Sequence, residues 1–163
     1  MANTIREFKF ARDIIHYVLT EYWPGIHWNP SGIFIEHDLD SPCTPAVQEM
    51  IKFILDNNYV VLHSLYDGYF PDQNVTERQH YEFCQNVICR PSMISDTAYA
   101  IKAFLVLCAS LSLFTALSVV YGVNEAPVIT HRLILRCFTS LQNLNLITDT
   151  FWEELQSFCE QFQ

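Results

Sequence analysis

The stretch AYAIKAFLVLCASLSLFTALSVVY, residues 98–121, decides the fold of this chain. After Lys102 no charged residue occurs until Glu125. An apolar segment of this length can span a membrane, which takes about 20 residues, or it can form the central helix of a helical domain. We favour the buried central helix, because the amphipathic segments on both sides of it have apolar faces that need something to cover. The membrane span is the alternative.

The composition predicts a single all-α domain over residues 1–163. Half of the 163 residues are hydrophobic and only four are glycine, which favours a sizeable helical core over a turn-rich β fold. The formal net charge of −9 argues against nucleic acid or anionic lipid as a partner. It is compatible with a basic peptide or protein partner.

Periodicity and capping residues predict five amphipathic helices, and one or two short ones, around the apolar helix. The first covers about residues 4–22, and a loop follows over 26–43. Thr44 and Pro45 begin the second helix. Residues 76–79 form a capping box for the third, which ends before Pro91.

The second half of the chain has similar signals for where helices begin and end. Ser95 and Asp96 are expected to cap the apolar helix, and Gly122 to end it. Pro127 begins the next helix, and residues 150–153 predict a capping box for the last. The expected inner face of the helix after Pro127 consists of Val128, Leu135, Phe138 and Leu141.

No motif for catalysis or metal binding stands out in the sequence. The six histidines show no HxxxH or HExxH spacing, and no phosphate-binding or nucleophile-elbow motif occurs. The six cysteines contain no CxxC pair and indicate small buried thiols in a reducing compartment. We therefore expect no cofactor, no metal and no enzymatic activity, although a Cys–His nucleophile pair stays open.

Four segments share a further pattern: DIIHYVL at 13–19, IKFILD at 51–56, AIKAFL at 100–105 and ITDTFWEEL at 147–155. In this order they resemble the N-terminal homology helix, the third homology motif, the start of the central helix and the second homology motif of the Bcl-2 family, the regulators of programmed cell death. The resemblance implies a Bcl-2-like bundle of about seven to eight helices around a buried central apolar helix.

The chain departs from the family at the arginine of its ligand groove. The family's Asn-Trp-Gly-Arg signature is absent, and Ala100 stands where that arginine would be. The family's long regulatory loop and C-terminal membrane anchor have no counterpart either. Loss of the signature with retention of the fold is typical of virus-encoded members, and the chain is similar to iridovirus or poxvirus versions in this respect.

The resemblance implies an inhibitor of apoptosis. Such a protein sequesters the BH-3 helix of pro-apoptotic, Bim-, Bak- or Bax-like proteins in a hydrophobic surface groove. It would act in the host-cell cytoplasm, with recruitment to the mitochondrial outer membrane through its partners and no stable membrane span. A homodimer is compatible with it, because an empty groove exposes apolar surface. The alternative is an adaptor or dimer of the same fold that inhibits host innate immune signalling without binding BH-3 helices.

The resemblance also places the groove residue by residue. An unpaired buried carboxylate is costly, so with Ala100 in place of the arginine we expect Arg90 to meet the aspartate of the ligand, and Lys102 is the second candidate. Trp152 is expected to lie in the core, and Asp56 to form a local cap or pair as readily as a ligand contact. The expected groove consists of Asn58, Val61, Leu62, Leu65, Tyr66, Tyr69, Val87, Arg90, Pro91, Tyr99, Ala100, Ala103, Leu107 and Phe158, with Cys159 as an alternative to Phe158.

Overall fold

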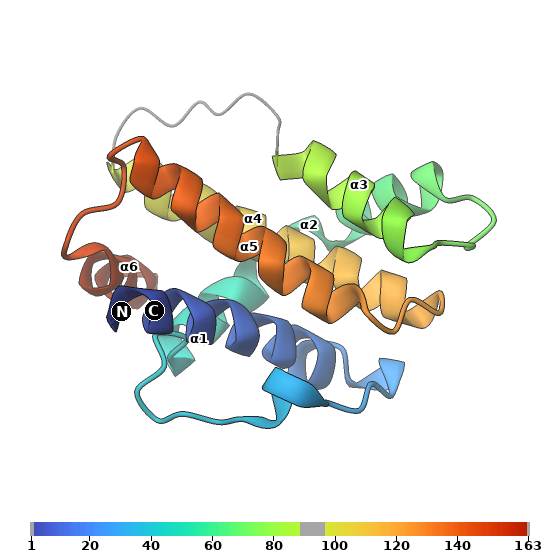
Figure 1. The fold of residues 1–163 in the computed structure, drawn as a ribbon, viewed down its shortest axis with the longest axis horizontal. Helices are drawn as coiled ribbons and strands as arrows, with labels where there is room; N and C mark the ends of the chain where they lie inside the picture. Colours follow the sequence, from blue (N-terminus) through green and yellow to red (C-terminus); the bar gives the residue numbers. More distant parts are fainter. Residues whose placement is uncertain (1, 89–96, 163) are drawn as a thin grey trace.

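The protein is all-α in a computed structural model that describes residues 2–88 and 97–162, and no strand occurs in these two ranges (Figure 1). The α-helices are α1 (Ala2–Tyr17), α2 (Pro45–Tyr69), α3 (Glu77–Ile88), α4 (Thr97–Val120), α5 (Ala126–Asn143) and α6 (Phe151–Glu160). Three short helical turns are η1 (Val18–Tyr22), η2 (Pro24–Ile26) and η3 (Gly32–Ile35). The predicted helical class is confirmed, but these ranges hold six α-helices and not seven or eight.

Helix α4 is the centre of the bundle. It runs beside α5 in Figure 1, and α1, α2, α3 and α6 also pack against it. Every side chain over residues 108–118 is buried. The segment Ala100–Val120 is long and apolar enough to cross a membrane, yet 72% of its most apolar window is buried inside the protein. Most of this apolar helix therefore lies in the core.

Side-chain caps fix the starts of α2 and α3. Thr44 Oγ1 accepts a hydrogen bond from the backbone N–H of Val47 at 3.4 Å, directly before Pro45. At α3 the capping is reciprocal: the N–H of Gln79 donates to Thr76 Oγ1 at 3.1 Å, and the N–H of Thr76 donates to Gln79 Oε1 at 3.0 Å. Both predicted helix starts are confirmed.

The predicted capping box of α6 is wrong. Thr150 precedes the helix with φ −104° and ψ 18°, and its side chain accepts no backbone hydrogen bond. A capping side chain needs an extended backbone at this position, and Thr150 does not have one. Its hydroxyl instead donates to Glu154 Oε2 at 2.7 Å, as does the hydroxyl of Thr148 at 2.8 Å.

Gly122 ends α4 as predicted. Its φ of +98° lies in the left-handed region that favours glycine. The N–H of Val123 then donates to the carbonyl of Ser118 at 2.8 Å and closes the turn. The predicted cap at Ser95 and Asp96 and the predicted end at Pro91 lie outside the described residues.

The inner face of α5 differs from the predicted one. Phe138 and Leu141 are buried, but Val128 and Leu135 are only half-buried. The remaining buried positions of α5 are Ala126, Pro127, Thr130, His131, Leu133 and Ile134. Thr130 and His131 are polar, and both have hydrogen-bond partners inside the bundle.

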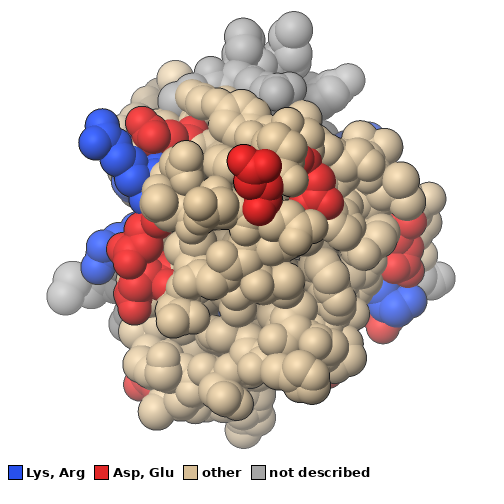
Figure 2. Space-filling view, turned by 90° about the vertical axis from the view of Figure 1, so that its right-hand side faces the viewer, with Lys and Arg blue, Asp and Glu red and all other residues tan. Residues whose placement is uncertain are grey.

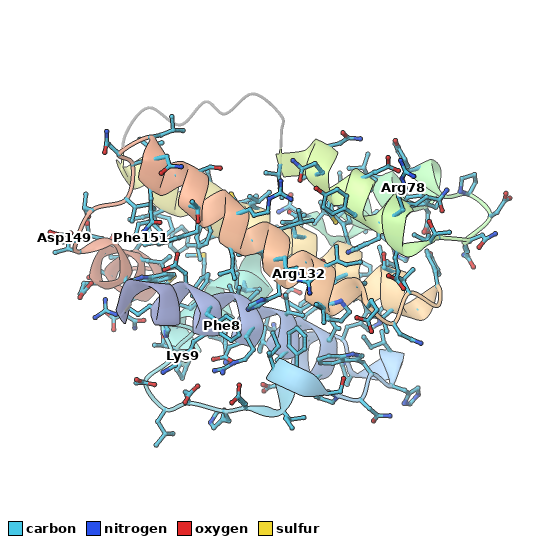
Figure 3. The ribbon with its side chains drawn as sticks, viewed as in Figure 1. Phe8, Lys9, Arg78, Arg132, Asp149 and Phe151 are labelled. Carbon is cyan, nitrogen blue, oxygen red and sulfur yellow. The ribbon has the colours of Figure 1, made fainter. Side chains whose placement is uncertain are left out.

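The aromatic core joins α6 to the rest of the bundle. Trp152 is 9% exposed; it stacks on Phe138 with 5.4 Å between ring centroids and lies 4.9 Å from Phe10. Figure 3 shows Phe151 inside the bundle and Asp149 at its margin, in agreement with their burial. The expectation that Trp152 lies in the core is confirmed.

Candidate partner-binding surface

Helix α2 has one apolar side that is covered along its first half and open along its second. Val47, Ile54 and Val61 follow one another at intervals of seven residues and so share a helix face. Val47 is fully buried and Ile54 half-buried, whereas Val61 is 69% exposed. Helix α6 packs on α2, and the hydroxyl of Thr44 at the start of α2 donates to Gln156 Oε1 of α6 at 2.5 Å. The cover that α6 provides therefore belongs to the first half of α2.

The open half of this side continues to the end of the helix. Val61, Leu65 and Tyr69 succeed one another at intervals of four residues and are 69%, 42% and 58% exposed. Leu62, beside them, is half-buried. An unbroken apolar stripe of this kind on a protein surface marks an interaction site more often than scattered apolar residues do.

Helix α4 shows the reverse arrangement. Ala103, Leu107 and Phe114 lie on one face, at intervals of four and seven residues. Phe114 is buried, with its ring centroid 4.9 Å from that of Phe83 of α3. Ala103 and Leu107 are half-buried, and Val106 next to them is 40% exposed. Helix α3 thus covers the second half of this face, and the first half stays partly open.

Both open stripes lead to Phe83. Its ring lies 5.1 Å from Tyr69, the last residue of the α2 stripe, and 4.9 Å from Phe114, which continues the α4 stripe. The two stripes therefore converge on α3. We call their exposed and half-buried residues the open α2–α4 surface and define it by Val61, Leu65, Tyr69, Ala103, Val106 and Leu107.

The structure removes two residues from the predicted groove surface. Tyr66 is fully buried: its ring stacks on Phe114 at 5.6 Å, and its hydroxyl is hydrogen-bonded to Ser118. Ala100 is also fully buried. Helix α4 is apolar on every side, so its sequence gives no polar face from which to decide which residues point outward.

The remaining predicted groove residues fall into two groups. Those that are exposed or half-buried are Asn58, Val61, Leu62, Leu65, Tyr69, Val87, Ala103, Leu107 and Phe158. Asn58 is engaged locally, since its amide donates to the carbonyl of Ile54 at 2.7 Å. Arg90, Pro91 and the side chain of Tyr99 lie outside the part of the chain that the structure describes, and the fully buried Cys159 offers no surface.

Sequence reasoning missed three exposed apolar residues: Val106 on α4, Phe53 on α2 and Phe162 after α6. Val106 adjoins Leu107, but on a helix without a polar face its exposure cannot be predicted. Phe53 and Phe162 are 53% and 56% exposed, and their ring centroids lie 5.8 Å apart. No sequence motif shows that the end of α6 lies next to α2, so this contact could not be predicted.

Two of the charged residues singled out by the family resemblance, Lys102 and Asp56, differ in their pairing. Lys102 is exposed, adjoins Ala103, and forms no ion pair with any described residue. Asp56, by contrast, accepts from Tyr22 at 2.9 Å and from Lys52 at 3.2 Å. Asp56 therefore forms local pairs, and Lys102 is the described cation available to a ligand at this surface.

The structure places Cys84 beside His80, and burial favours the uncharged form of both side chains. Cys84 Sγ lies 3.7 Å from His80 Nε2 inside the bundle. Burial lowers the pKa of His80 to about 4 and raises the pKa of the Cys84 thiol. Both shifts disfavour a thiolate–imidazolium pair, which a cysteine nucleophile needs. Among residues 2–88 and 97–162 no group of three or more His, Cys, Asp or Glu is placed to hold a metal ion.

Charge is unevenly placed at the end of the bundle where α3 begins and α4 turns into α5. Figure 2 shows this face with most of its Lys, Arg, Asp and Glu side chains toward the margins and a broad uncharged area between them.

No family model, curated protein or solved structure matches the chain.

Proposed function

We propose that this protein is a virus-encoded, Bcl-2-like inhibitor of apoptosis that sequesters the BH-3 helix of pro-apoptotic, Bim-, Bak- or Bax-like proteins on the open α2–α4 surface. The observation that carries the proposal is the exposed stripe of Val61, Leu65 and Tyr69. It continues the helix face on which Val47 is buried, so a further amphipathic helix would extend a packing already present in the fold. The order of the four motif segments supports the same family.

The chemistry of the surface fits an amphipathic helical ligand. Such a ligand offers apolar side chains at i, i+3 or i+4, and i+7, and the open stripe is itself a row of apolar side chains. Burying each large apolar side chain of the ligand contributes ~1.5–3 kcal/mol. Several such anchors leave a dissociation constant in the nanomolar range after ordering costs are subtracted, about −12 kcal/mol in all.

The ligand's aspartate needs a partner other than Ala100. That residue is fully buried and uncharged, so it can neither reach nor neutralise a carboxylate. Lys102 adjoins the open surface and is exposed. A pair formed there is screened by solvent and contributes modestly, at most about 1 kcal/mol. Arg90, the first candidate from the family resemblance, lies outside the described residues.

Calorimetric titration of the purified protein with a panel of BH-3 peptides tests the proposal. We expect at least one peptide to bind with a dissociation constant below about 1 μM, or −8 kcal/mol. The same peptide with its apolar anchors replaced by alanine is the control and should not bind. Failure of every peptide to bind would contradict the proposal.

The same exposed surface also suits the alternative function. In an adaptor that blocks innate immune signalling without BH-3 binding, a second copy of the chain would cover Val61, Leu65 and Tyr69. Sedimentation velocity separates the two cases. A monomer that binds peptide supports sequestration, whereas a dimer that binds no peptide and dissociates on Leu65→Glu supports the alternative.

A further inference from the structure

A second site lies on a different side of α2. An open pocket of about 450 Å³ is formed between η1 and the middle of α2, and this volume is in the range of small-ligand sites. Its α2 residues, Lys52, Asp56 and Tyr59, recur at intervals of four and three, on a helix face other than that of Val61 and Leu65. The pocket is lined by Tyr17, Glu21, Tyr22, Trp23, Lys52, Asp56 and Tyr59.

Four of the seven residues that line the pocket are aromatic. Trp23 and Tyr59 meet edge to face, with 6.0 Å between centroids and 79° between planes. The Tyr22 ring is held in place because its hydroxyl donates to Asp56 Oδ1 at 2.9 Å. Tyr17 lies deeper and is 8% exposed. The faces of such rings attract cations, and tryptophan does so most strongly.

The charges of the pocket favour a cation as well. Lys52 is already held by Asp56, with Nζ 3.2 Å from Oδ2. Glu21 is exposed and forms no ion pair with any described residue. Two carboxylates against one ammonium group leave the lining with an excess negative charge. Burial, and then the nearby charges of Glu49, Glu21 and Asp56, raise the pKa of Tyr17 to about 12, in agreement with a negative local potential.

We propose that this pocket binds a guanidinium group, presented by the arginine side chain of a basic peptide segment. A guanidinium is planar, stacks on aromatic faces and donates two parallel hydrogen bonds to a carboxylate, here that of Glu21. An ammonium group offers only a compact charge and loses more hydration on binding. The net charge of −9 attracts a basic segment to the protein. The site does not depend on the open α2–α4 surface, and both can be occupied together.

An NMR titration of the ¹⁵N-labelled full chain with three matched probes tests the site. The probes are ethylguanidinium, ethylammonium and the uncharged isostere ethylurea. We expect the indole N–H signal of Trp23 to shift saturably with ethylguanidinium, with a millimolar dissociation constant as for a contact of about −4 kcal/mol. Ethylammonium should bind several-fold more weakly and ethylurea not at all. Equal shifts with ethylurea, or no saturation with ethylguanidinium, would overturn the proposal.

Two substitutions with opposite expected effects on ethylguanidinium binding test the roles of Glu21 and Lys52. Glu21→Gln removes the free carboxylate and should weaken ethylguanidinium binding about fivefold, as expected for a partly exposed charge pair. Lys52→Met removes the competing cation and should strengthen it. Glu77→Gln on α3 is the control, because it changes the net charge by the same amount outside the pocket. Equal effects of Glu21→Gln and Glu77→Gln, or weaker binding by Lys52→Met, would contradict the assignment.

A peptide comparison identifies the source of the guanidinium. A capped Gly-Arg-Gly peptide and its citrulline counterpart differ only in the charge and donors of the side chain. We expect the arginine peptide to shift Trp23 and the citrulline peptide to leave it unchanged. If ethylguanidinium binds and the arginine peptide does not, the pocket takes a free small cation and the proposed peptide ligand is wrong.

Discussion

Ser118 and His80 are joined in the middle of the bundle by a hydrogen bond of 2.6 Å between Ser118 Oγ and His80 Nδ1. His80 Nε2 lies 2.9 Å from Thr130 Oγ1 on α5. The side chain of His80 is fully buried. One imidazole thus links α3 to both α4 and α5.

The donors and acceptors of this hydrogen-bond network can be assigned by starting from Thr115. The hydroxyl of Thr115 donates to the carbonyl of Leu111 at 2.7 Å, so Thr130 must donate its own proton to Thr115 in their hydrogen bond. Thr130 then accepts from His80 Nε2–H, which leaves Nδ1 as the acceptor for Ser118. A proton added at Nδ1 would remove that acceptor, so the network requires neutral His80.

The first prediction is a loss of stability in mild acid. Burial lowers the pKa of His80 to about 4 from its ordinary value of 6.5. Between these two values the unfolded chain binds a proton that the folded protein does not, so the free energy of unfolding falls as pH falls from 6.5 to 4. The loss at the lower end amounts to about 3 kcal/mol. Urea unfolding at pH 7.5, 5.5 and 4.5 measures it.

Variants separate His80 from other titrating groups. Burial also lowers the pKa of His131, which acts with the same sign, and raises the pKa of Glu7, which acts with the opposite sign. His80→Gln should be less stable at pH 7.5 and should flatten the dependence between pH 6.5 and 4. The exposed His37→Gln should leave it unchanged. An unaltered slope in His80→Gln would show that this histidine is not responsible.

The second prediction compares two threonines that precede helices. Thr76 and Gln79 cap α3 reciprocally, so Thr76→Ala should lower the free energy of unfolding by about 1 kcal/mol. Thr150 caps no backbone group of α6, and Thr150→Ala should stay within about 0.5 kcal/mol of the wild type. Thermal or urea unfolding of both variants provides the measurement. Equal losses would contradict the difference in capping.

These threonines also show when a local sequence motif correctly predicts a helix cap and when it does not. Thr44 and Thr76 have the extended backbone or the reciprocal partner that their motifs require, and both were predicted correctly. Thr150 has the same sequence pattern, but its backbone follows the turn that begins near Asn145, whose φ is +60°. That conformation depends on how α5 and α6 pack, which no four-residue motif contains.

Burial in the core was predictable only where the sequence has a period. Helix α2 has apolar residues at helical spacing. Of its predicted groove residues only Tyr66 is fully buried, where its hydroxyl is hydrogen-bonded to Ser118. Arg12 of α1 carries a charge, which favours an exposed position. It is 2% exposed, because Asp13 and Asp38 both bind its guanidinium, at 2.7 and 3.0 Å. The second of these partners comes from a distant loop that the sequence could not place.

The third prediction tests the open α2–α4 surface with two adjacent valines. Val60 and Val61 are 71% and 69% exposed, but their side chains point about 100° apart around α2. Val61→Glu places a carboxylate among the apolar anchors and should weaken BH-3 peptide binding at least tenfold, about 1.4 kcal/mol. Calorimetric titration with the tightest peptide of the panel measures the change.

Val60→Glu is the matched control. It adds the same charge to the same helix at the same exposure, so its effects on net charge and helix propensity equal those of Val61→Glu. We expect the peptide to bind Val60→Glu within about twofold of the wild type, since exposed substitutions away from a contact have small effects. Equal weakening by both variants would place the ligand elsewhere.

The fourth prediction assigns Lys102 as the partner of the ligand's aspartate. Replacing that aspartate by lysine in the peptide should weaken binding to the wild type by removing an attraction and adding a repulsion. Lys102→Glu should restore part of the affinity for the lysine peptide, with a coupling energy of about 0.5–1 kcal/mol in a double-mutant cycle. The coupling should shrink in high salt, because the pair is solvent-exposed.

Arg132→Glu supplies the reference for this cycle. Arg132 is exposed on α5 (Figure 3), and its reversal changes the net charge by the same amount as Lys102→Glu. Long-range attraction or repulsion of the peptide therefore affects both variants alike, and only a direct pair adds coupling at Lys102. If the two cycles give the same coupling energy, Lys102 does not meet the aspartate, and Arg90, the first candidate from the family resemblance, is the residue to test next.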